Sequence, residues 1–292
     1  MKVYKGKYIA DLYKEILDDL YNKPEYISKP RDMECREILN CVIEVEEPNM
    51  NLIKNEYHSS QEKYIGAELL WYFSGTKNCA FIENYAKMWT QLKDAKNEAN
   101  SAYGYLLFKE ENQDEYTQYE WVINSLKKDK DSRQAFMHFN RPYHQYDGNK
   151  DQVCTLNALF HIREDKLYMT LNMRSNDIIF GFLNDYVFFN MLHQQAYIHL
   201  KTYYKDLKMG SYTHISHSMH LYEKHYDKVK NMLNHDFVAY ATPELKQSII
   251  EEVGIFKIKY FKLFHPVIKN NKIKIDKTNN DVLDWCLSKI KE

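Results

Sequence analysis

This sequence of 292 residues lacks long apolar runs, an excess of charge of one sign, and closely spaced cysteines. No apolar run approaches the ~18 residues that a membrane-spanning helix requires. Residues 1–21 carry scattered charges and contain no apolar signal-peptide core, so we expect a cytoplasmic protein. The formal net charge of −1 disfavours a general binder of nucleic acid or of membrane surfaces.

The cysteines disfavour both a disulfide framework and a zinc site. There are five of them, an odd number, and no two form a Cys-X-X-Cys pair. In the segment HISHSMH, three histidines are spaced by three residues, a pattern that could bind a metal on a helix: His214, His217 and His220. No acidic partner is fixed beside them, so no metal site is predicted.

Arginine is also scarce, because only six of the 40 basic residues are arginines. A chain this rich in lysine is expected to use arginine where its planar fork matters, as in bidentate phosphate recognition. Ordinary surface ion pairs are the alternative use. The six are Arg31, Arg36, Arg133, Arg141, Arg163 and Arg174.

The hydrophobic periodicity predicts a mixture of helices and strands without an internal repeat or a linker. Helices are expected over residues 8–21, 63–75, 78–92 and 118–128, the second ending at Gly75. Strands are expected over residues 41–47 and 133–139. The last stretch, 265–292, is expected to contain a strand and a short terminal helix.

A β-hairpin is the clearest predicted element. Residues 153–163 and 166–175 are both extended, and a short polar turn joins them. Closing the hairpin at this turn places Cys154 opposite Ser175, with Arg174 as its near neighbour. A loop containing Gly181 should follow, and then a long helix that starts near Asn184 as its N-cap and runs to about Leu207.

Four side chains near these elements each have an ordinary interpretation. Cys154 could be a buried strand cysteine, Asp185 could serve a helix dipole, and Arg174 could form an ion pair. Glu68 interrupts the apolar pattern GAELLWYF and could simply face solvent. Taken together, they make a thiol beside a guanidinium with two carboxylates near, which is typical of an activated nucleophile.

Six motifs in a fixed order give the chain a recognisable resemblance. They are ELLWYFSGTKN (68–78), YG (103–104), DSR (131–133), Cys154 on its strand, RSND…G (174–181) and HLY (220–222). This set resembles the thymidylate synthase family over roughly residues 60–230. The run MRSND and FGF-X-NDY are most similar to those of the phage-type deoxycytidylate hydroxymethylases.

The resemblance implies an α/β (α+β) fold in which a large mixed β-sheet is packed with helices. A homodimer would form through the sheet and share its active sites. Residues 1–235 would make the catalytic domain, and residues 236–292 would pack on it or extend it. The one-carbon donor would be 5,10-methylenetetrahydrofolate.

The resemblance also implies roles for individual residues at the nucleotide. Cys154 would be the nucleophile that adds to C6 of the pyrimidine. The phosphate would be held by Arg174, by Ser175, and by Arg133 of the other subunit. The family's N-terminal phosphate arginine has no clear match, and Arg36 is a candidate.

Other carried-over roles concern the sugar, the protons and the cofactor. His220 and Tyr222 would grip the sugar 3′-hydroxyl. Glu68 would relay protons, and Tyr103 would lie near the C5 proton that is removed. Three residues would contact folate: Asp177, Trp89 and Gly181.

Asp185 stands where the synthases carry an asparagine. A carboxylate can accept from N4 of cytosine and share a proton with N3, whereas an amide matches uracil. We therefore expect a phage-type enzyme that converts dCMP to 5-hydroxymethyl-dCMP. Two alternatives stay open: a synthase-like C5 methyltransferase acting on dUMP or dCMP, and a degenerate member that binds nucleotide or RNA and regulates.

Overall fold

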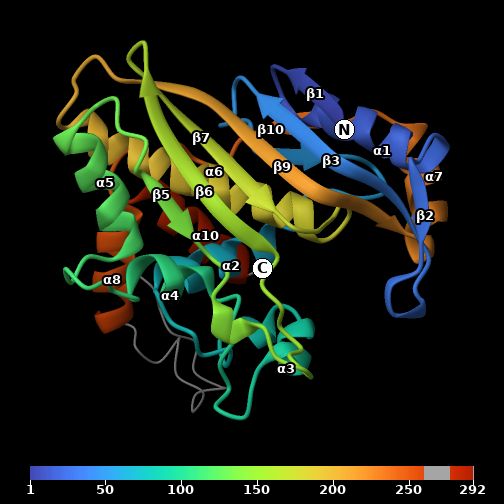
Figure 1. Cartoon of the computed structure of the whole chain (residues 1–292), viewed down its shortest axis with the longest axis horizontal. Helices are drawn as coiled ribbons and strands as arrows, with labels where there is room; N and C mark the ends of the chain where they lie inside the picture. Colours follow the sequence, from blue (N-terminus) through green and yellow to red (C-terminus); the bar gives the residue numbers. More distant parts are fainter. Residues whose placement is uncertain (260–276, 292) are drawn as a thin grey trace.

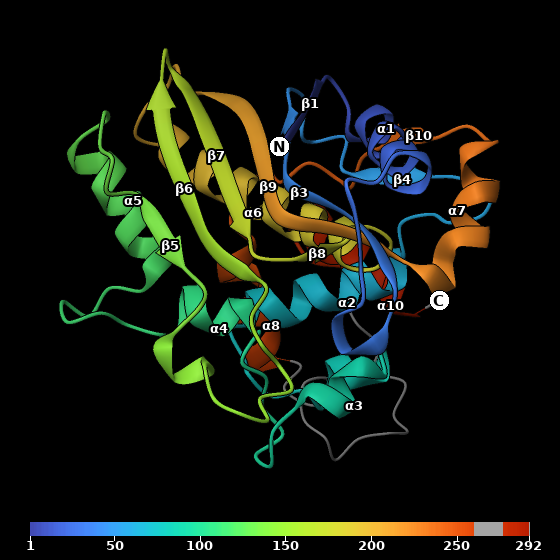
Figure 2. The ribbon, with the colours of Figure 1, turned by 45° about the vertical axis from the view of Figure 1, so that its right-hand side comes forward.

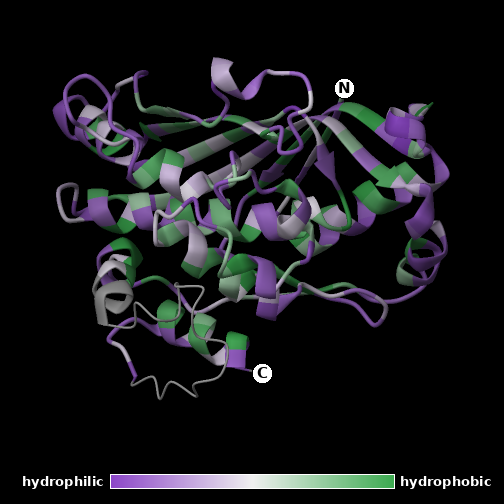
Figure 3. Cartoon of the chain, turned by 90° about the horizontal axis from the view of Figure 1, so that it is seen from below, coloured by the Kyte–Doolittle hydropathy of each residue, from purple (hydrophilic) through white to green (hydrophobic). Residues whose placement is uncertain are grey.

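The computed structural model describes residues 1–259 and 277–291. Strands lie on one side and most helices on the other, as Figures 1 and 3 show from two directions. The main sheet runs in the order β1 (Lys2–Gly6), β3 (Cys35–Val45), β9 (Lys208–Tyr222), β7 (Lys166–Met173), β6 (Thr155–Arg163) and β5 (Phe136–His138). The β1–β3 and β7–β9 pairs are parallel and the others antiparallel, so the expected large mixed sheet is confirmed.

Smaller elements complete the chain. Two short strands flank the main path: β2 (Tyr26–Ser28) pairs with β3, and β8 (Asn176–Asp177) pairs with β9. A separate antiparallel pair joins β4 (Leu52–Lys54) to β10 (Val238–Tyr240). The short 3-10 turns are η1 (Pro30–Asp32), η2 (Ile82–Asn84), η3 (Pro142–His144) and η4 (Glu223–His225).

The helices fall largely where their periodicity predicts. They are α1 (Ile9–Asn22), α2 (Glu62–Phe73), α3 (Met88–Leu92), α4 (Tyr103–Phe108), α5 (Gln118–Lys128), α6 (Gly181–Lys201), α7 (Tyr226–Leu233), α8 (Ile249–Lys259) and α10 (Asp281–Lys291). Helix α2 ends just before Gly75, whose φ of +66° is the left-handed conformation that glycine adopts easily. The amphipathic α5 begins with a capping box formed by Thr117 and Glu120.

The β6–β7 hairpin presents two different faces. Its inner face is apolar and fully buried, with Phe160 and Leu171 among the residues that the sheet contributes to the core. Helix α6 covers this face and is itself mostly buried. The outer face carries half-exposed residues such as Leu159, Thr170 and Asn172, and the strands lie unobstructed in front of the helices in Figure 1.

A β-bulge corrects the predicted hairpin register. Residues pair as predicted from Arg163–Lys166 to Asn157–Asn172, but Thr155 then pairs with Met173. One extra residue in β6 therefore shifts the end of the hairpin. The backbone N–H of Arg174, not Ser175, meets the Cys154 carbonyl, at 2.9 Å.

The start of α6 also differs from the prediction. Gly181 lies inside the helix rather than in a loop, and Asn184 does not cap it but donates to the Phe180 carbonyl at 2.8 Å. The α6 N-cap position, Phe180, has no side-chain cap, and Asp177 shapes the turn before the helix, where its Oδ1 accepts from the backbone N–H of Ile179 at 2.8 Å. The helix ends at Lys201, short of Leu207.

One more expectation is wrong, one possibility is not realised, and one expectation lies outside the described residues. Residues 78–92 form η2 and α3 rather than one helix, because the Asn84 side chain donates to the Ala80 and Phe81 carbonyls and competes with helical bonding. HISHSMH lies in strand β9, not on a helix. The strand expected at the start of 265–292 falls largely on undescribed residues, whereas the terminal helix is α10.

A close approach of two helices fixes the position of Tyr103. A Cβ on Gly104 in α4 would lie only 1.6 Å from the Tyr72 carbonyl oxygen in α2. Without a side chain there, the rings of Tyr72 and Tyr103 stack with centroids 5.2 Å apart. Gly104 is therefore needed for backbone contact rather than for a turn.

We predict that Gly104→Ala destabilises the protein by about 3 kcal/mol or more, because backbone must move to relieve the overlap. Thermal or denaturant unfolding measures the loss. Gly254→Ala in α8 is the matched control, since a Cβ there meets nothing within 4 Å. Equal stability of the two variants would contradict this account of the α2–α4 contact.

Candidate active site

One cleft of about 570 Å³ gathers seven of the predicted site residues. Its walls come from α2, α3, α4, the first turns of α6, the segment before β6 and the end of β7. The seven residues are Glu68, Trp89, Tyr103, Cys154, Arg174, Gly181 and Asp185. Residues more than a hundred positions apart in the sequence thus meet around the thiol of Cys154.

The bulge in β6 sets Cys154 beside Arg174. The guanidinium Nη2 lies 3.5 Å from Sγ and also donates to the Gln152 carbonyl at 2.7 Å, while Nε donates to the Val153 carbonyl at 2.9 Å. These carbonyl bonds hold the guanidinium in place next to the sulfur. Cys154 is half-buried, whereas the other four cysteines are buried, so it is the thiol that a substrate can reach.

Burial and charge act on this thiol in opposite directions. Burial raises the pKa of Cys154, Arg174 lowers it, and the carboxylates of Asp185 and Asp151 raise it. Burial prevails, so the pKa is raised overall even though Arg174 acts in the expected direction. Burial in the wall of the cleft therefore favours the protonated thiol.

Glu68 is held by a chain of hydrogen bonds within the wall of the cleft. The Tyr64 hydroxyl donates to Oε1 of Glu68 at 2.6 Å, and the Trp89 indole N–H donates to the Tyr64 oxygen at 3.1 Å. Burial raises the pKa of Glu68 to about 8, with hydrogen bonds from Tyr64 and Tyr72 opposing and the Asp185 charge reinforcing the rise. Glu68 can thus exchange a proton near neutral pH.

Asp185 projects into the same cleft from α6. It is half-buried, and its Oδ2 accepts from the Asn176 side-chain amide at 2.9 Å. The surrounding protein withdraws it from bulk water and raises its pKa to about 7, while the hydrogen bond from Asn176 opposes the rise. Nearby, the Tyr103 hydroxyl accepts from the Thr155 hydroxyl at 3.0 Å.

The cleft contains one arginine that the sequence interpretation did not select. Arg31 lines the cleft from η1, where its φ is +55°. Burial raises the pKa of the Tyr222 hydroxyl, and a hydrogen bond with Arg31 opposes this rise. The rings of Tyr222 and His220 lie 4.9 Å apart on β9. The loop that carries Arg31 hangs beside α3 in Figure 2. The scarcity of arginine in the chain was the available signal.

Arg36, the candidate named from the sequence, lies elsewhere. Its guanidinium packs over the rings of Tyr226 and Tyr21, at 4.1 and 4.9 Å from their centroids, and donates to the Tyr21 carbonyl. Its side chain therefore serves the packing of α1 against α7. This contact explains an arginine at that position without a ligand.

The remaining predicted residues lie around the cleft or away from it. Ser175 follows Arg174, and Asp177 uses its carboxylate to hold the turn before α6 rather than to line the cleft. Arg133 is exposed on the loop after α5, beside a different cavity, and makes no hydrogen bond or ion pair with the described part of the chain. An Arg133 that acts at the cleft would have to come from another copy.

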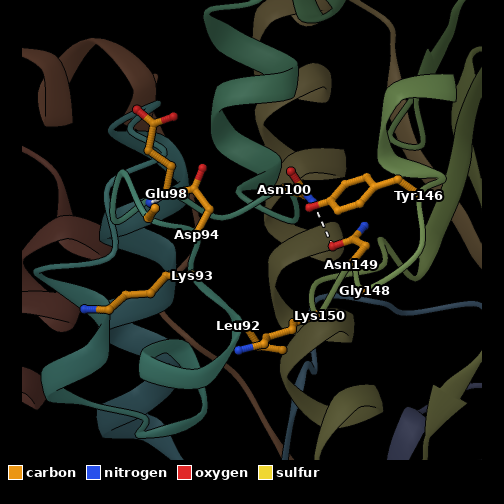
Figure 4. Close-up of a pocket in the computed structure, with 10 residues that line it drawn as sticks. Leu92, Lys93, Asp94, Glu98, Asn100, Tyr146, Gly148, Asn149 and Lys150 are labelled. Atoms are coloured by element: carbon orange, nitrogen blue, oxygen red, sulfur yellow. Dashed lines mark hydrogen bonds between the residues drawn. The ribbon is translucent and has the colours of Figure 1, made fainter.

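A smaller pocket of about 230 Å³ adjoins the cleft (Figure 4). The two share Leu92, Asn149 and Lys150, and the amide of Asn100 donates to Asn149 Oδ1 at 3.2 Å. The pocket is lined largely by polar and charged side chains and contains none of the predicted catalytic residues. It extends the cleft outward past α3.

Residues 1–259 and 277–291 contain neither a metal-ligand cluster nor a membrane-spanning helix. Among them, no group of three or more histidine, cysteine or acidic side chains could hold a metal ion. Strand geometry sends His217 to the opposite face from His214 and His220, which separates that trio. Nor is any described helix long and apolar enough to cross a membrane.

The sequence matches the family described as "Thymidylate synthase" over residues 11–276. This chain belongs to the thymidylate synthase family. It is an enzyme of that family by this match, and the predicted family resemblance is confirmed.

The similar proteins include phage hydroxymethyltransferases. The chain is 34% identical over 180 residues to the deoxycytidylate 5-hydroxymethyltransferase of Enterobacteria phage T2, covering 59% of this chain and 72% of that protein. It is 26% identical over 231 residues to the deoxyuridylate hydroxymethyltransferase of Bacillus phage SP01, covering 76% and 59%. The fold is similar to thermostable thymidylate synthase A from Bacillus subtilis, with a TM-score of 0.66, 17% identity and coverage of 84% and 93%.

Burial of Glu68 generates a prediction about stability. Between its ordinary pKa of 4.5 and about 8, the folded protein retains a proton that the unfolded chain has lost, so stability falls as pH rises through this window. Glu68→Gln cannot ionise and should therefore gain on the order of 2 kcal/mol relative to wild type between about pH 5 and about pH 8.5, while losing activity.

Unfolding at the two pH values measures this difference. Glu15→Gln, which removes an exposed carboxylate from α1, is the control and should leave the pH dependence unchanged. Parallel stability profiles for wild type and Glu68→Gln would show that Glu68 is not held protonated by the fold.

Proposed function

We propose that this chain is a pyrimidine nucleotide C5 hydroxymethyltransferase that converts dCMP to 5-hydroxymethyl-dCMP with 5,10-methylenetetrahydrofolate. The observation that carries the proposal is a carboxyl group, that of Asp185, facing the cleft that holds Cys154. The phage deoxycytidylate 5-hydroxymethyltransferases, 34% identical over part of the chain, support the same substrate and a phage source.

The carboxyl group of Asp185 can match the hydrogen-bonding edge of cytosine. The ring presents a donor at N4 and an acceptor at N3, so a carboxylate accepts from N4 and a shared proton completes the pair at N3. A pKa of about 7 allows that proton to be present at neutral pH. A proton on N3 also draws electrons from C6 and assists attack by the Cys154 sulfur.

The other roles follow from the positions of the side chains. Cys154 forms the bond to C6 after losing its proton, and Arg174 and Arg31 provide cationic groups for the phosphate at the same end of the cleft. Ser175 adds a hydroxyl there. Substrate phosphate would draw Arg174 toward itself while keeping its charge near the thiol.

Proton handling is assigned to the opposite wall of the cleft. Glu68, held by Tyr64 and with a pKa of about 8, orders water and moves protons, and the Tyr103 hydroxyl, which lines the same cleft, would lie near C5 of the bound pyrimidine. His220 and Tyr222 bind the sugar 3′-hydroxyl beside Arg31. Among these groups, Glu68 has a pKa of about 8, which suits proton transfer near neutral pH.

The cleft also has a wall suited to a flat aromatic cofactor. Apolar and aromatic side chains line it on the side of α3 and α6, and two of them are well exposed, Met88 at 47% and Phe180 at 43%. When bound, methylenetetrahydrofolate supplies the one-carbon unit that the family transfers. Trp89 and Gly181 are the cleft residues that would hold it, and Asp177 lies just behind Gly181.

A homodimer through the sheet would complete the site. The outer face of the sheet is half-exposed and partly apolar, with Leu159, Ile215 and Val42 on it. Arg133 makes no ion pair with the described part of its own chain and is exposed on a loop. A second copy packed on this face would bring Arg133 to the partner's phosphate.

A second candidate is supported by the relative from phage SP01, a deoxyuridylate hydroxymethyltransferase. A synthase-like methyltransferase acting on dUMP or dCMP is the further alternative. Incubating the protein with methylenetetrahydrofolate and either nucleotide, and identifying the product by mass, separates these reactions. A methyl product, or a product from dUMP alone, would refute the proposal.

Asp185→Asn should reverse the choice of base. The amide cannot supply the cytosine pattern, so kcat/KM for dCMP should fall at least ~100-fold while relative use of dUMP improves. Asp227→Asn, an exposed first-turn carboxylate of α7, is the control and should leave the dCMP/dUMP ratio unchanged. If the ratio is also unchanged in Asp185→Asn, Asp185 does not select the base.

Complementation tests the shared site. Arg133→Ala and Cys154→Ala should each be inactive, and after subunit exchange their mixture should regain about a quarter of wild-type activity, since half of the dimers carry one intact site. A mixture of Cys154→Ala with Glu68→Gln should regain nothing, because both residues come from one subunit. No recovery in the first mixture, once exchange is demonstrated, would rule out a trans arginine.

A further inference from the structure

The contact between Asn176 and Asp185 joins a strand to a helix behind the cleft. Asn176 lies in β8, pairs with Met219 of β9, and is only 3% exposed. Its side-chain amide reaches Asp185 Oδ2 at 2.9 Å across the start of α6. This bond fills one acceptor site of Oδ2 from behind, whereas no described side chain donates to Oδ1, which stays available to a ligand in the cleft.

Gly181 provides the room for this hydrogen bond. A Cβ at position 181 would lie 3.0 Å from Nδ2 of Asn176 and 3.4 Å from Oδ2 of Asp185. The first distance is tighter than an ordinary contact and the second is at the lower limit of one, so a larger residue would displace chiefly the Asn176 amide and lengthen its bond to the carboxylate. Gly181 thus has a structural reason to be glycine that is independent of any cofactor.

The charge around Asp185 is otherwise unfavourable to its ionised form. The titratable groups that interact with it come from α2, α4, β9 and the segment before β6: Glu68, Tyr64, Tyr72, Tyr103, Tyr212 and Cys154. All of these are neutral or negative. The Asn176 amide is the side-chain donor that favours the carboxylate form.

We propose that Asn176 is the positioning residue for Asp185. Its amide orients the carboxyl group and favours the ionised form, and Gly181 leaves the space for this contact. Asn176 thereby sets the preference for an aminopyrimidine nucleotide over an oxopyrimidine nucleotide. This inference rests on the proposed function, in which Asp185 reads the base. Asn176 acts through Asp185 and does not touch the nucleotide. A donor to the ionised carboxyl keeps Oδ1 free to accept from N4.

Two variants perturb the same hydrogen bond from opposite sides. Asn176→Ala removes the donor, and Gly181→Ala separates the donor from the acceptor. Each should lower the dCMP/dUMP ratio of kcat/KM by about 10-fold and raise the midpoint of the Asp185 titration by about one pH unit. The titration is followed by carboxyl-¹³C NMR of the free enzyme, with the Asp185 signal identified by its loss in Asp185→Asn.

Asn190→Ala is the matched control, since Asn190 is a fully buried asparagine of α6 that also has one side-chain atom without a hydrogen bond. It should lower the melting temperature without moving the ratio or the midpoint. If Asn176→Ala does not fold, Gly181→Ala decides by the same two readouts, because alanine near a helix start carries no propensity cost.

The outcomes separate this inference from the proposed function. Wild type that prefers dCMP, with neither ratio nor midpoint changed in the variants, overturns the role of Asn176 alone. Wild type that prefers dUMP overturns the proposed function and the specificity role together. A shifted midpoint and a reduced ratio, with Asn190→Ala unchanged in both, support the inference.

Discussion

Two carboxyl groups, those of Glu68 and Asp185, share a cleft whose walls withdraw them from water. The rest of the site depends on how the protein offsets the free-energy cost of burying these two groups. Both pKa values are raised toward neutrality, to about 8 and about 7, chiefly by burial. Neither group is neutralised by a direct ion pair among the described residues. Neutral donors, the Tyr64 hydroxyl and the Asn176 amide, meet them instead, which preserves their ability to gain and lose protons.

A rigid aromatic framework makes this arrangement possible. Trp89 holds Tyr64, Tyr64 holds Glu68, and the stacked rings of Tyr72 and Tyr103 close the next layer. The backbone contact at Gly104 brings those layers together. Since each ring is fixed by its neighbours, the polar tips point into the cleft without the entropy loss that flexible side chains would incur on binding.

The sequence predicts the parts of the site that depend on alternation and on ordered motifs. The β6–β7 hairpin and the helices over 8–21 and 118–128 follow from hydrophobic period alone, but a period of two cannot reveal the extra residue between Thr155 and Asn157. Local side-chain bonds decided the other differences, since Asp177 holds a turn that lets α6 begin at Gly181, ahead of Asn184. Scarcity marked all six arginines alike, and Arg31 could not be distinguished from the others because its position depends on a loop with left-handed backbone.

The choice between aspartate and asparagine at position 185 also links base selection to pH. An amide presents one fixed pattern of donor and acceptor. A carboxyl group with a pKa of about 7 presents two patterns at neutral pH: a donor with an acceptor when it is protonated, and acceptors alone when it is ionised. Selecting cytosine with such a group requires control over which form prevails, and the only neighbouring side chain that donates to it is buried behind α6 in the described structure. The choice of substrate base in the cleft is thus set partly by the packing of Asn176 behind α6.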